Sequence, residues 1–142
     1  MNEYPARFVK EEDGKFSVFF LGKGMEGCIT YGNDRDDARK NAQEALDAYI
    51  GYLYSERKRI PAPVSVSGDG IEYFAPDYRI QFAITLRKNR EKRHITQSDM
   101  ASRMGILPAQ YQRLENPKKT NPTLETIHRI EEALGDSVFL RF

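Results

Sequence analysis

The residues from Ile95 to Pro117 read ITQSDMASRMGILPAQYQRLENP and carry side chains suited to recognition rather than to bond making. Gln110, Gln112 and Arg113 fall within one short helical segment of this stretch. In the major groove of duplex DNA, a glutamine amide pairs with adenine and an arginine guanidinium pairs with guanine. Each such pair gives about 1–3 kcal/mol of discrimination against a wrong base. The spacing therefore predicts a surface that reads bases.

Two short helices joined by a tight turn would position these side chains. Thr96 can cap the first helix, with Asp99 at its third position. Gly105 supplies the positive φ of a helix stop, and Pro108 suits the first turn of the next helix. Ala101 is small where the two helices would cross. The side chains expected to clamp the second helix onto its core are Ile106, Tyr111 and Leu114, and those expected to face outward are Ala109, Gln110, Gln112 and Arg113.

The sequence shows no pattern for covalent or metal chemistry. His94 and His128 have no further ligands at metal spacing, and a single cysteine, Cys28, excludes an internal disulfide or a cysteine-based zinc site. A nuclease with a ribonuclease-H-like site would need carboxylates that converge on Mg²⁺ from strands and a helix. The expected strands carry aliphatic and aromatic residues instead. We therefore expect a protein that is not an enzyme and needs no metal or cofactor.

The formal net charge of +1 conceals two halves of opposite sign. Residues 1–75 hold ten Lys and Arg against thirteen Asp and Glu, and residues 76–142 hold twelve against eight. The two halves thus carry −3 and +4, which suggests one basic and one polyanionic partner. No apolar run approaches the roughly 18 residues of a membrane helix, and the N-terminus does not resemble a signal peptide. We expect a cytoplasmic protein without membrane contact.

The first half predicts a β-β-β-α order. Apolar residues alternate over residues 4–9 and 16–20 on either side of Asp13-Gly14, which favours a β-hairpin, and a third short strand covers residues 27–31. Asp34 suits the N-cap of the helix that follows, which should end near Glu56. Its expected apolar face comprises Ala38, Ala42, Ala45, Leu46, Tyr49 and Leu53.

The stretch PAPVSVSGDG then indicates a connection between domains, with a short strand around residues 64–66. We predict an N-terminal domain over residues 1–66, a linker over residues 67–76 and a helical domain over residues 77–142. The last helix should begin after Thr123, end at Gly135 and be followed by a strand over residues 137–142. Its expected inward residues are Leu124, Ile127, Ile130 and Leu134. The fold class is α+β.

The pattern T-Q-x-D-M-A-x-R-M-G-I-x-x-x-x-Y-x-x-L-E-N resembles the Cro/repressor (Xre) class of helix-turn-helix. The resemblance implies that Gln97 contacts a DNA phosphate and that Arg90 and Glu115 form a structural ion pair. Pro108 and Ala109 depart from relatives, which often carry polar base readers there. The following loop would reach the DNA backbone through Lys118, Lys119 and Asn121.

The first half resembles the HicB family of antitoxins in YPARFVKEEDGKFSVFF, in GCITYGNDRDDARKNAQEALDAYI and in the exit IPAPVS. The resemblance implies a partial ribonuclease-H-like fold without catalytic residues. It also implies an antitoxin that masks HicA, a small basic toxin that cleaves mRNA, and that represses its own operon by binding operator DNA. The loop FLGKGMEGC departs from the F-P-D-L-P-G-C of relatives. The acidic candidates for toxin contact are Glu11, Glu12, Asp13, Asp36 and Asp37, each of which has an ordinary structural role as an alternative.

One alternative is a stand-alone repressor whose first domain senses a small ligand, and the residues alone leave it open. A homodimer or higher homo-oligomer is expected in either case, because a helix-turn-helix protein usually reads two half-sites one helical turn apart. The apolar tail VFLRF could pair across a two-fold axis or close the chain's own fold.

Overall fold

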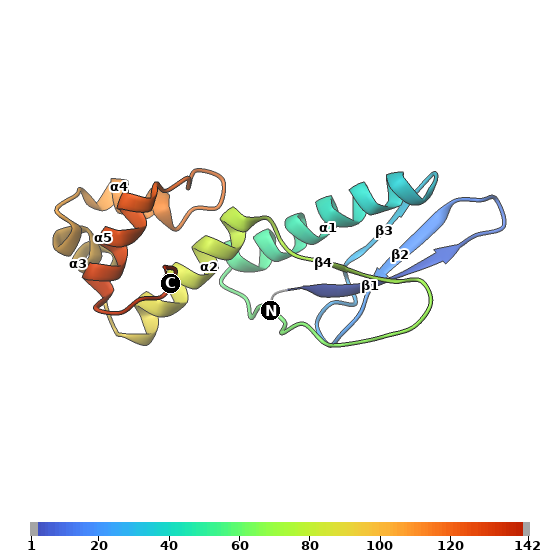
Figure 1. Ribbon diagram of the computed structural model, residues 1–142, viewed down its shortest axis with the longest axis horizontal. Coiled ribbons are helices and arrows are strands. Elements are labelled where there is room, and N and C mark those ends of the chain that lie inside the picture. Colours follow the sequence, from blue (N-terminus) through green and yellow to red (C-terminus); the bar gives the residue numbers. More distant parts are fainter. Residues whose placement is uncertain (1–2, 141–142) are drawn as a thin grey trace. The chain divides into compact units, whose positions relative to one another are not determined.

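The computed structural model describes residues 3–140 and divides into two compact units, residues 1–78 and residues 79–142. The first unit contains β1 (Tyr4–Lys10), β2 (Phe16–Phe20), β3 (Ile29–Gly32), α1 (Arg35–Ser55) and β4 (Ile71–Phe74). Helix α2 (Tyr78–Lys92) begins at the boundary, and α3 (Gln97–Met104), α4 (Pro108–Leu114) and α5 (Leu124–Leu134) follow (Figure 1). The α+β class and the all-helical second unit confirm the predicted fold class.

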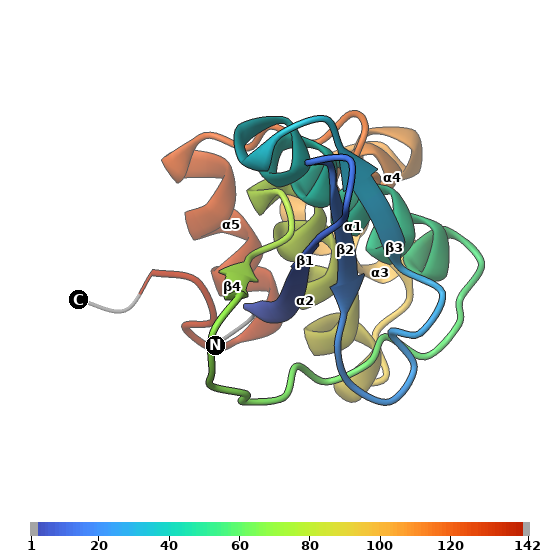
Figure 2. The same cartoon turned by 90° about the vertical axis from the view of Figure 1, so that its right-hand side faces the viewer.

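The strands of the first unit form one antiparallel sheet in the order β3-β2-β1-β4. Strands β1 and β2 make the predicted hairpin, with Val18 opposite Phe8, and Gly14 adopts a φ of +83° in the connecting turn. Figure 2 shows β1, β2 and β3 side by side, with α1 behind them. Alternate residues along each strand therefore face α1 or face away from it.

Helix α1 covers one face of this sheet and builds the core of the first unit with it. Asp34 caps the helix as predicted, because its carboxylate accepts a hydrogen bond from the Asp37 amide. The buried apolar side chains are Ala6, Phe8, Val18 and Phe20 from the sheet and Ala38, Ala42, Leu46, Ile50 and Leu53 from α1. At Gly32, an added Cβ would lie 2.2 Å from the backbone nitrogen of Ala38, so only glycine lets β3 approach the helix this closely.

The fourth strand lies later in the sequence than predicted. Residues 64–66 form no strand, whereas Ile71–Phe74 pairs antiparallel with the first four residues of β1. Four residues of the segment predicted as a linker, 67–76, therefore belong to the sheet, and that part of the prediction is wrong. The ring of Phe74 packs against Phe8 and Phe20, with centroids 6.0 and 5.9 Å away, which anchors the late strand to the core.

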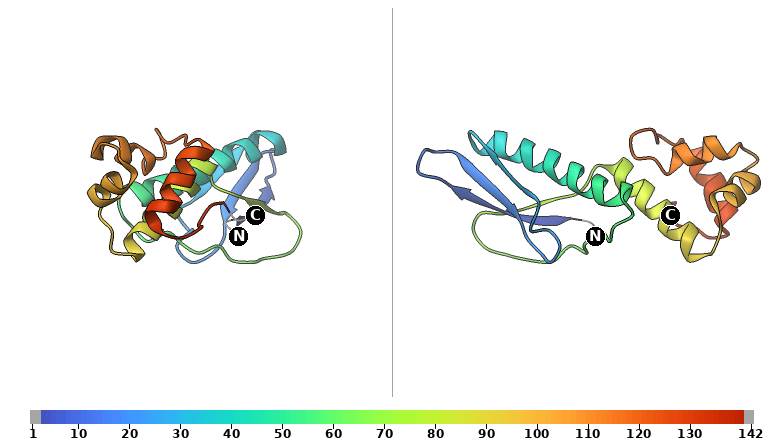
Figure 3. Two further views of the ribbon diagram at one scale, coloured as in Figure 1. Left: turned by 60° about the vertical axis from the view of Figure 1, so that its left-hand side comes forward. Right: turned by 180° about the vertical axis from the view of Figure 1, so that it is seen from behind.

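The second unit packs α3, α4 and α5 with the C-terminal part of α2. The right-hand view of Figure 3 shows these helices in yellow-green to red. Thr123 caps α5, and Gly135 ends it with a φ of +79°, as predicted. Ile130 and Leu134 are buried, but Leu124 is 71% exposed, so its predicted inward position is wrong. As the first residue of α5, it precedes the turns of the helix that pack on the core.

The chain after α5 does not form the predicted strand over residues 137–140, and residues 141 and 142 lie outside the described residues. The backbone amides of Val138, Phe139 and Leu140 instead donate hydrogen bonds of 2.6, 2.6 and 3.0 Å to the Oε2 atom of Glu131. The ring of Phe139 also packs 4.9 Å from that of Phe82. These residues close the chain's own unit, and their amides are not available for pairing across a two-fold axis.

Candidate nucleic-acid interface

The turn between α3 and α4 has the predicted local structure. Thr96 and Asp99 form a capping box, in which each side chain accepts a hydrogen bond from the other residue's amide. Gly105 ends α3 with a φ of +69°, and the Ile106 amide donates to the Ala101 carbonyl over 3.0 Å. Pro108 occupies the first turn of α4. Local sequence therefore fixes where α4 begins.

Apolar packing fixes which side of α4 faces outward. Tyr111 is fully buried in a cluster with Leu86, Met100 and Ile130, and Ile106 and Leu114 pack against that cluster. The predicted clamp is confirmed. The opposite side of the helix is thereby left to solvent.

A buried ion pair joins α2 to the end of α4. The Nε and Nη2 atoms of Arg90 donate to the two carboxylate oxygens of Glu115 over 2.6 and 3.0 Å. The Tyr111 hydroxyl and the Gln97 amide also donate to this carboxylate, and the Nη1 atom of Arg90 donates to the Ile95 carbonyl over 2.9 Å. One hydrogen-bonded network thus joins α2, α3 and α4 in a single geometry.

The network keeps Glu115 ionised. Burial opposes its charge, but the hydrogen bonds from Arg90, Tyr111 and Gln97 outweigh burial and hold the pKa of Glu115 below its ordinary value. The bond to Glu115 raises the pKa of Arg90. Burial, together with the same carboxylate, raises the pKa of Tyr111, which therefore stays a neutral donor.

The four residues predicted to face the groove, Ala109, Gln110, Gln112 and Arg113, are all exposed on α4. Gln110 has an additional local role, because its Oε1 atom accepts a hydrogen bond of 2.9 Å from the Leu107 amide. This bond turns the Gln110 side chain back toward the start of the helix. The sequence pattern did not reveal that role, although a glutamine three residues after a helix cap is a known signature of it.

Gln97, predicted to contact phosphate, is half-buried and donates from Nε2 to the Oε1 atom of Glu115 over 3.1 Å. In this arrangement its side chain supports the ion pair. Its contact with phosphate stays a prediction.

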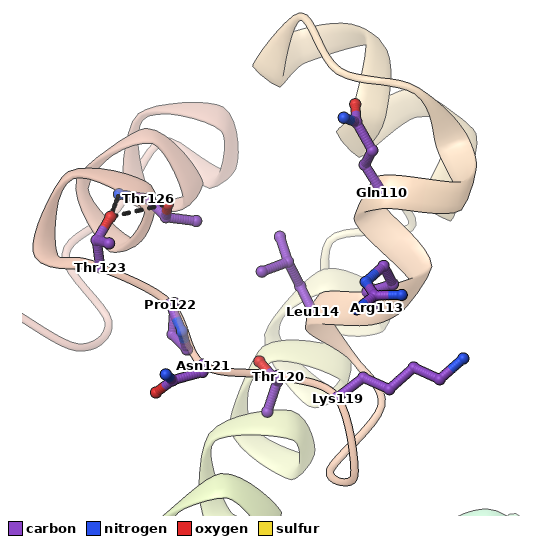
Figure 4. Close-up of a pocket in the computed structure, with 9 residues that line it drawn as sticks. All are labelled: Gln110, Arg113, Leu114, Lys119, Thr120, Asn121, Pro122, Thr123 and Thr126. Atoms are coloured by element: carbon purple, nitrogen blue, oxygen red, sulfur yellow. Dashed lines mark hydrogen bonds between the residues drawn. The ribbon is translucent and has the colours of Figure 1, made fainter.

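The loop between α4 and α5 presents the three remaining predicted residues, Lys118, Lys119 and Asn121, all of which are exposed. Its fold is set by Asn116, whose side chain accepts from the Lys118 amide and whose carbonyl accepts from the Thr120 amide. A cavity of about 290 Å³ lies between this loop, α4 and the start of α5. Figure 4 shows Gln110, Arg113 and Lys119 along its α4 and loop side. The structure thus places predicted base-reading and phosphate-contacting residues around one concave surface.

The five acidic candidates for partner contact fall in two groups at one end of the sheet. Glu11, Glu12 and Asp13 form the turn after β1, and Asp36 and Asp37 lie in the first turn of α1. The strand pairing brings these groups together, because Lys10 lies opposite Phe16 and Phe16 lies opposite Gly32, just before α1.

Three of these acids already have partners within the unit. Asp13 and Asp37 accept backbone amides, from Lys15 and Asn33 respectively, and Asp36 forms an ion pair of 3.1 Å with Arg39. Their local roles are therefore evident in the structure, whereas their contact with a partner stays a prediction.

Sequence reasoning missed a second surface, the outer sheet face, which we define by Val9, Phe19, Ile29, Tyr31 and Tyr73. These side chains point away from α1 and are exposed, with Ile29 at 56% and Tyr31 at 67%. The strand pairing sets Ile29 beside Phe19. Alternation along β2 and β3 could have located this face, because Phe19, Ile29 and Tyr31 have the parity opposite to the buried set.

Among residues 3–140, no helix is both long and apolar enough to cross a membrane. The same range contains no group of three or more His, Cys, Asp or Glu side chains arranged to hold a metal ion. Cys28 is buried at 2% exposure, and burial raises the pKa of its thiol to about 11.

Comparison with known families assigns a class to each unit. Residues 3–72 match the family described as the HicB-like antitoxin of bacterial toxin-antitoxin systems, and residues 86–137 match the helix-turn-helix family. The chain therefore joins a HicB-like antitoxin domain to an Xre-type helix-turn-helix DNA-binding domain.

Two curated relatives align with nearly the whole chain. Antitoxin HicB 1 of Photorhabdus laumondii is 22% identical over 137 residues, which cover 96% of this chain and 84% of the relative. Antitoxin HicB 2 of the same organism is 25% identical over 132 residues, which cover 93% and 90%. The predicted resemblance to HicB antitoxins and to the Xre class is confirmed.

Proposed function

We propose that this protein is the antitoxin of a type II toxin-antitoxin system. In this proposal its first unit binds and neutralises a HicA-type, mRNA-cleaving toxin, and its second unit represses its own operon by binding operator DNA as a homodimer or higher homo-oligomer. The role is regulatory rather than catalytic. The observation that carries the proposal is the presence in one chain of an exposed α4 surface and of a HicB-like unit with an uncovered apolar sheet face.

The α4 surface supports DNA binding. Gln112 and Arg113 are exposed on the helix, and the loop adds Lys118 and Lys119 beside them. Residues 76–142 carry a net charge of +4, which favours contact with a polyanion. Hydrogen-bonding side chains on the helix would read bases, while the loop lysines would neutralise phosphates.

The outer sheet face supports binding of a protein partner. The face also carries the exposed Arg7, which lies opposite Phe19. Exposed aliphatic and aromatic side chains gathered on one face of a small unit are typical of protein interfaces, and tyrosines contribute strongly to such interfaces. Residues 1–75 carry a net charge of −3, which would speed encounter with a basic toxin. The acidic end of the sheet adds to that attraction.

The toxin part is tested by inhibition of RNA cleavage. The small basic toxin that this proposal expects to be encoded beside this gene would be purified, and its cleavage of mRNA measured as full-length antitoxin is added. We expect complete inhibition at equimolar amounts. The double variant Ile29→Ser/Tyr31→Ser should need at least about tenfold more protein, since central interface residues each contribute more than about 1 kcal/mol.

A matched control for that variant is Leu124→Ser, because Leu124 is equally exposed but lies on α5. It should inhibit like the unchanged protein. If the neighbouring protein is not inhibited while promoter DNA is still bound, the ligand-sensing repressor becomes the better function. If both variants inhibit normally, the toxin contacts another surface.

The DNA part is tested by two substitutions that separate base reading from phosphate contact. Arg113→Ala should relax sequence preference at one position by about 1–3 kcal/mol. Lys118→Ala should weaken binding to all sequences alike and reduce the salt dependence by about one phosphate contact. Equal weakening on every sequence by Arg113→Ala would contradict its assignment as a base reader.

A further inference from the structure

The start of α4 presents only apolar side chains at the place from which a recognition helix reaches base edges. Leu107, which precedes the helix, is 66% exposed, and Pro108 and Ala109 are exposed beside it. In a helix-turn-helix, the N-terminal residues of the second helix contact the bases. None of these three side chains can donate or accept a hydrogen bond.

The nearest polar side chain is partly committed elsewhere. The side-chain oxygen Oε1 of Gln110 accepts a hydrogen bond of 2.9 Å from the Leu107 amide. This bond would have to break before the Gln110 side chain could form both of its hydrogen bonds with adenine. Gln112 and Arg113 lie further along the helix. Hydrogen-bond readout is therefore weak at the tip of α4.

Exposure of Leu107 is not explained by the packing of its own unit. Its neighbour Ile106 packs on the helical core, and the cluster of Tyr111 and its partners is complete without Leu107. In the major groove, the apolar group that a leucine or an alanine can contact is the C5 methyl of thymine. The apolar side chains at the start of α4 thus match the C5 methyl group of thymine.

We propose that Leu107 and Ala109 read the C5 methyl groups of pyrimidines in the operator, so that this protein selects thymine by apolar contact. The inference rests on the proposed DNA binding and specifies which part of the base is recognised. It has a consequence for modified DNA: 5-methylcytosine carries the same methyl group and should be preferred over cytosine at the same position.

The experiment uses the full-length protein and duplexes selected from a random pool by repeated binding at about 150 mM salt. In the tightest duplex, each thymine is replaced in turn by deoxyuridine, which removes the methyl group and leaves every hydrogen-bonding atom. We expect a loss of about fourfold in affinity for each contacted methyl, from the transfer free energy of one buried carbon group. At the same position, a duplex with 5-methylcytosine should bind about fourfold more tightly than a duplex with cytosine, because the methyl group is restored.

Variants assign the effect to the tip of α4. Leu107→Ala should bind the thymine duplex more weakly and respond less to deoxyuridine at one position, while Leu107→Met should keep the response. Leu124→Ala, the same kind of change at an equally exposed leucine of α5, should leave the response unchanged. Arg113→Ala should weaken binding but retain the methyl response.

The outcomes separate this inference from the proposed function. If the protein binds selected duplexes tightly but binds thymine and deoxyuridine duplexes equally at every position, the inference is overturned and the proposed function stands. If it binds no duplex DNA above the non-specific level, both are overturned. An unchanged methyl response in Leu107→Ala, with a change in its mass in solution, would show that Leu107 serves contact between protein chains and would overturn the inference.

Discussion

The two units of this chain distribute polarity in opposite ways. The first unit has an apolar interior between the sheet and α1, yet it presents the apolar outer sheet face. The second unit presents glutamine, arginine and lysine side chains. Among the described residues, however, all four buried polar or charged ones, Arg90, Glu115, Thr120 and Glu131, lie in that second unit.

The difference shows how each surface is held in place. The sheet face is positioned by backbone hydrogen bonds between strands, which any sequence of suitable alternation can form. The α4 surface is positioned by side chains that must meet in one geometry, because an unpaired buried charge costs several kcal/mol. Substitutions inside the second unit should therefore disturb its surface more than comparable changes disturb the sheet.

The largest effect is expected from Glu115→Gln. It leaves the buried Arg90 without its counter-charge, which should lower the free energy of unfolding of the second unit by about 3–5 kcal/mol. Amide signals followed by NMR during urea titration would report each unit separately.

The first unit should unfold at its usual urea concentration in that variant. Glu132→Gln is the matched control, because Glu132 is exposed and its pair with His128 lies on the surface. Replacing the pair as Arg90→Met/Glu115→Leu should restore part of the loss. A small effect of Glu115→Gln would contradict the contrast between the two interiors.

The next effect is expected from Gly32→Ala in the first unit. Its Cβ would lie 2.2 Å from the Ala38 nitrogen, so β3 must move from α1, at a cost of about 1–3 kcal/mol. Gly27→Ala is the matched control, since its Cβ would meet the Tyr49 ring at an ordinary 3.5 Å. The same urea titration gives the free energy of unfolding of both variants. Equal losses would show that the close approach of β3 to α1 at Gly32 does not contribute to the stability of the first unit.

A smaller effect is expected from Thr96→Ala, which removes the capping box of α3. The loss should be about 1 kcal/mol in the second unit alone, because the Asp99 amide loses its acceptor. Ser98→Ala, at an exposed position inside the helix, serves as the control. Amide exchange over residues 97–104 would measure the difference, and faster exchange in the first unit as well would contradict a local role.

The smallest effect is a difference in acid response. The pKa of Glu115 is lowered by folding, so its contribution to stability is present above the ordinary value of 4.5 and is lost as pH falls below it. In the first unit, burial raises the pKa of Asp47, despite hydrogen bonds from the Asp77 amide and Gln43. The contribution of Asp47 to stability is therefore present below its ordinary pKa of 3.8 and is lost as pH rises. Urea titrations at pH 6 and pH 4 should show the second unit losing more stability than the first. The difference should shrink in Glu115→Gln, and a difference that persists there would rule out Glu115 as its source.

Local signals in the sequence predicted most of the helices and their ends. Asp34, Thr96 and Thr123 each supply a cap within a few residues, and Gly105 and Gly135 each supply a positive φ. Such interactions join residues close in the sequence, so spacing alone reveals them.

The predictions that were wrong or incomplete concern interaction partners that the spacing of residues along the sequence does not reveal. Strand β4 pairs with β1 although the paired residues lie more than 60 positions apart in the sequence. Nothing in the sequence of either strand identifies the other as its partner. The tail after α5 has high β propensity, but the Glu131 carboxylate binds three of its amides. At the candidate interface, the exposure of α4 was predictable. The bond from the Leu107 amide to Gln110 was missed because the cap residue, Leu107, is apolar, so the first half of the usual capping pattern is absent.

The buried thiol of Cys28 gives a practical route to following both surfaces. It is the single cysteine of the chain, and with its pKa near 11 it carries roughly a few-hundred-fold less thiolate than an exposed cysteine of pKa about 8.5. A cysteine introduced at the exposed Lys10 of β1 or at Ser98 would therefore take a maleimide dye in preference to the native one. One fluorophore on the sheet and another, in a second preparation, on α3 would report occupancy of each surface in the same mixture of partner and DNA.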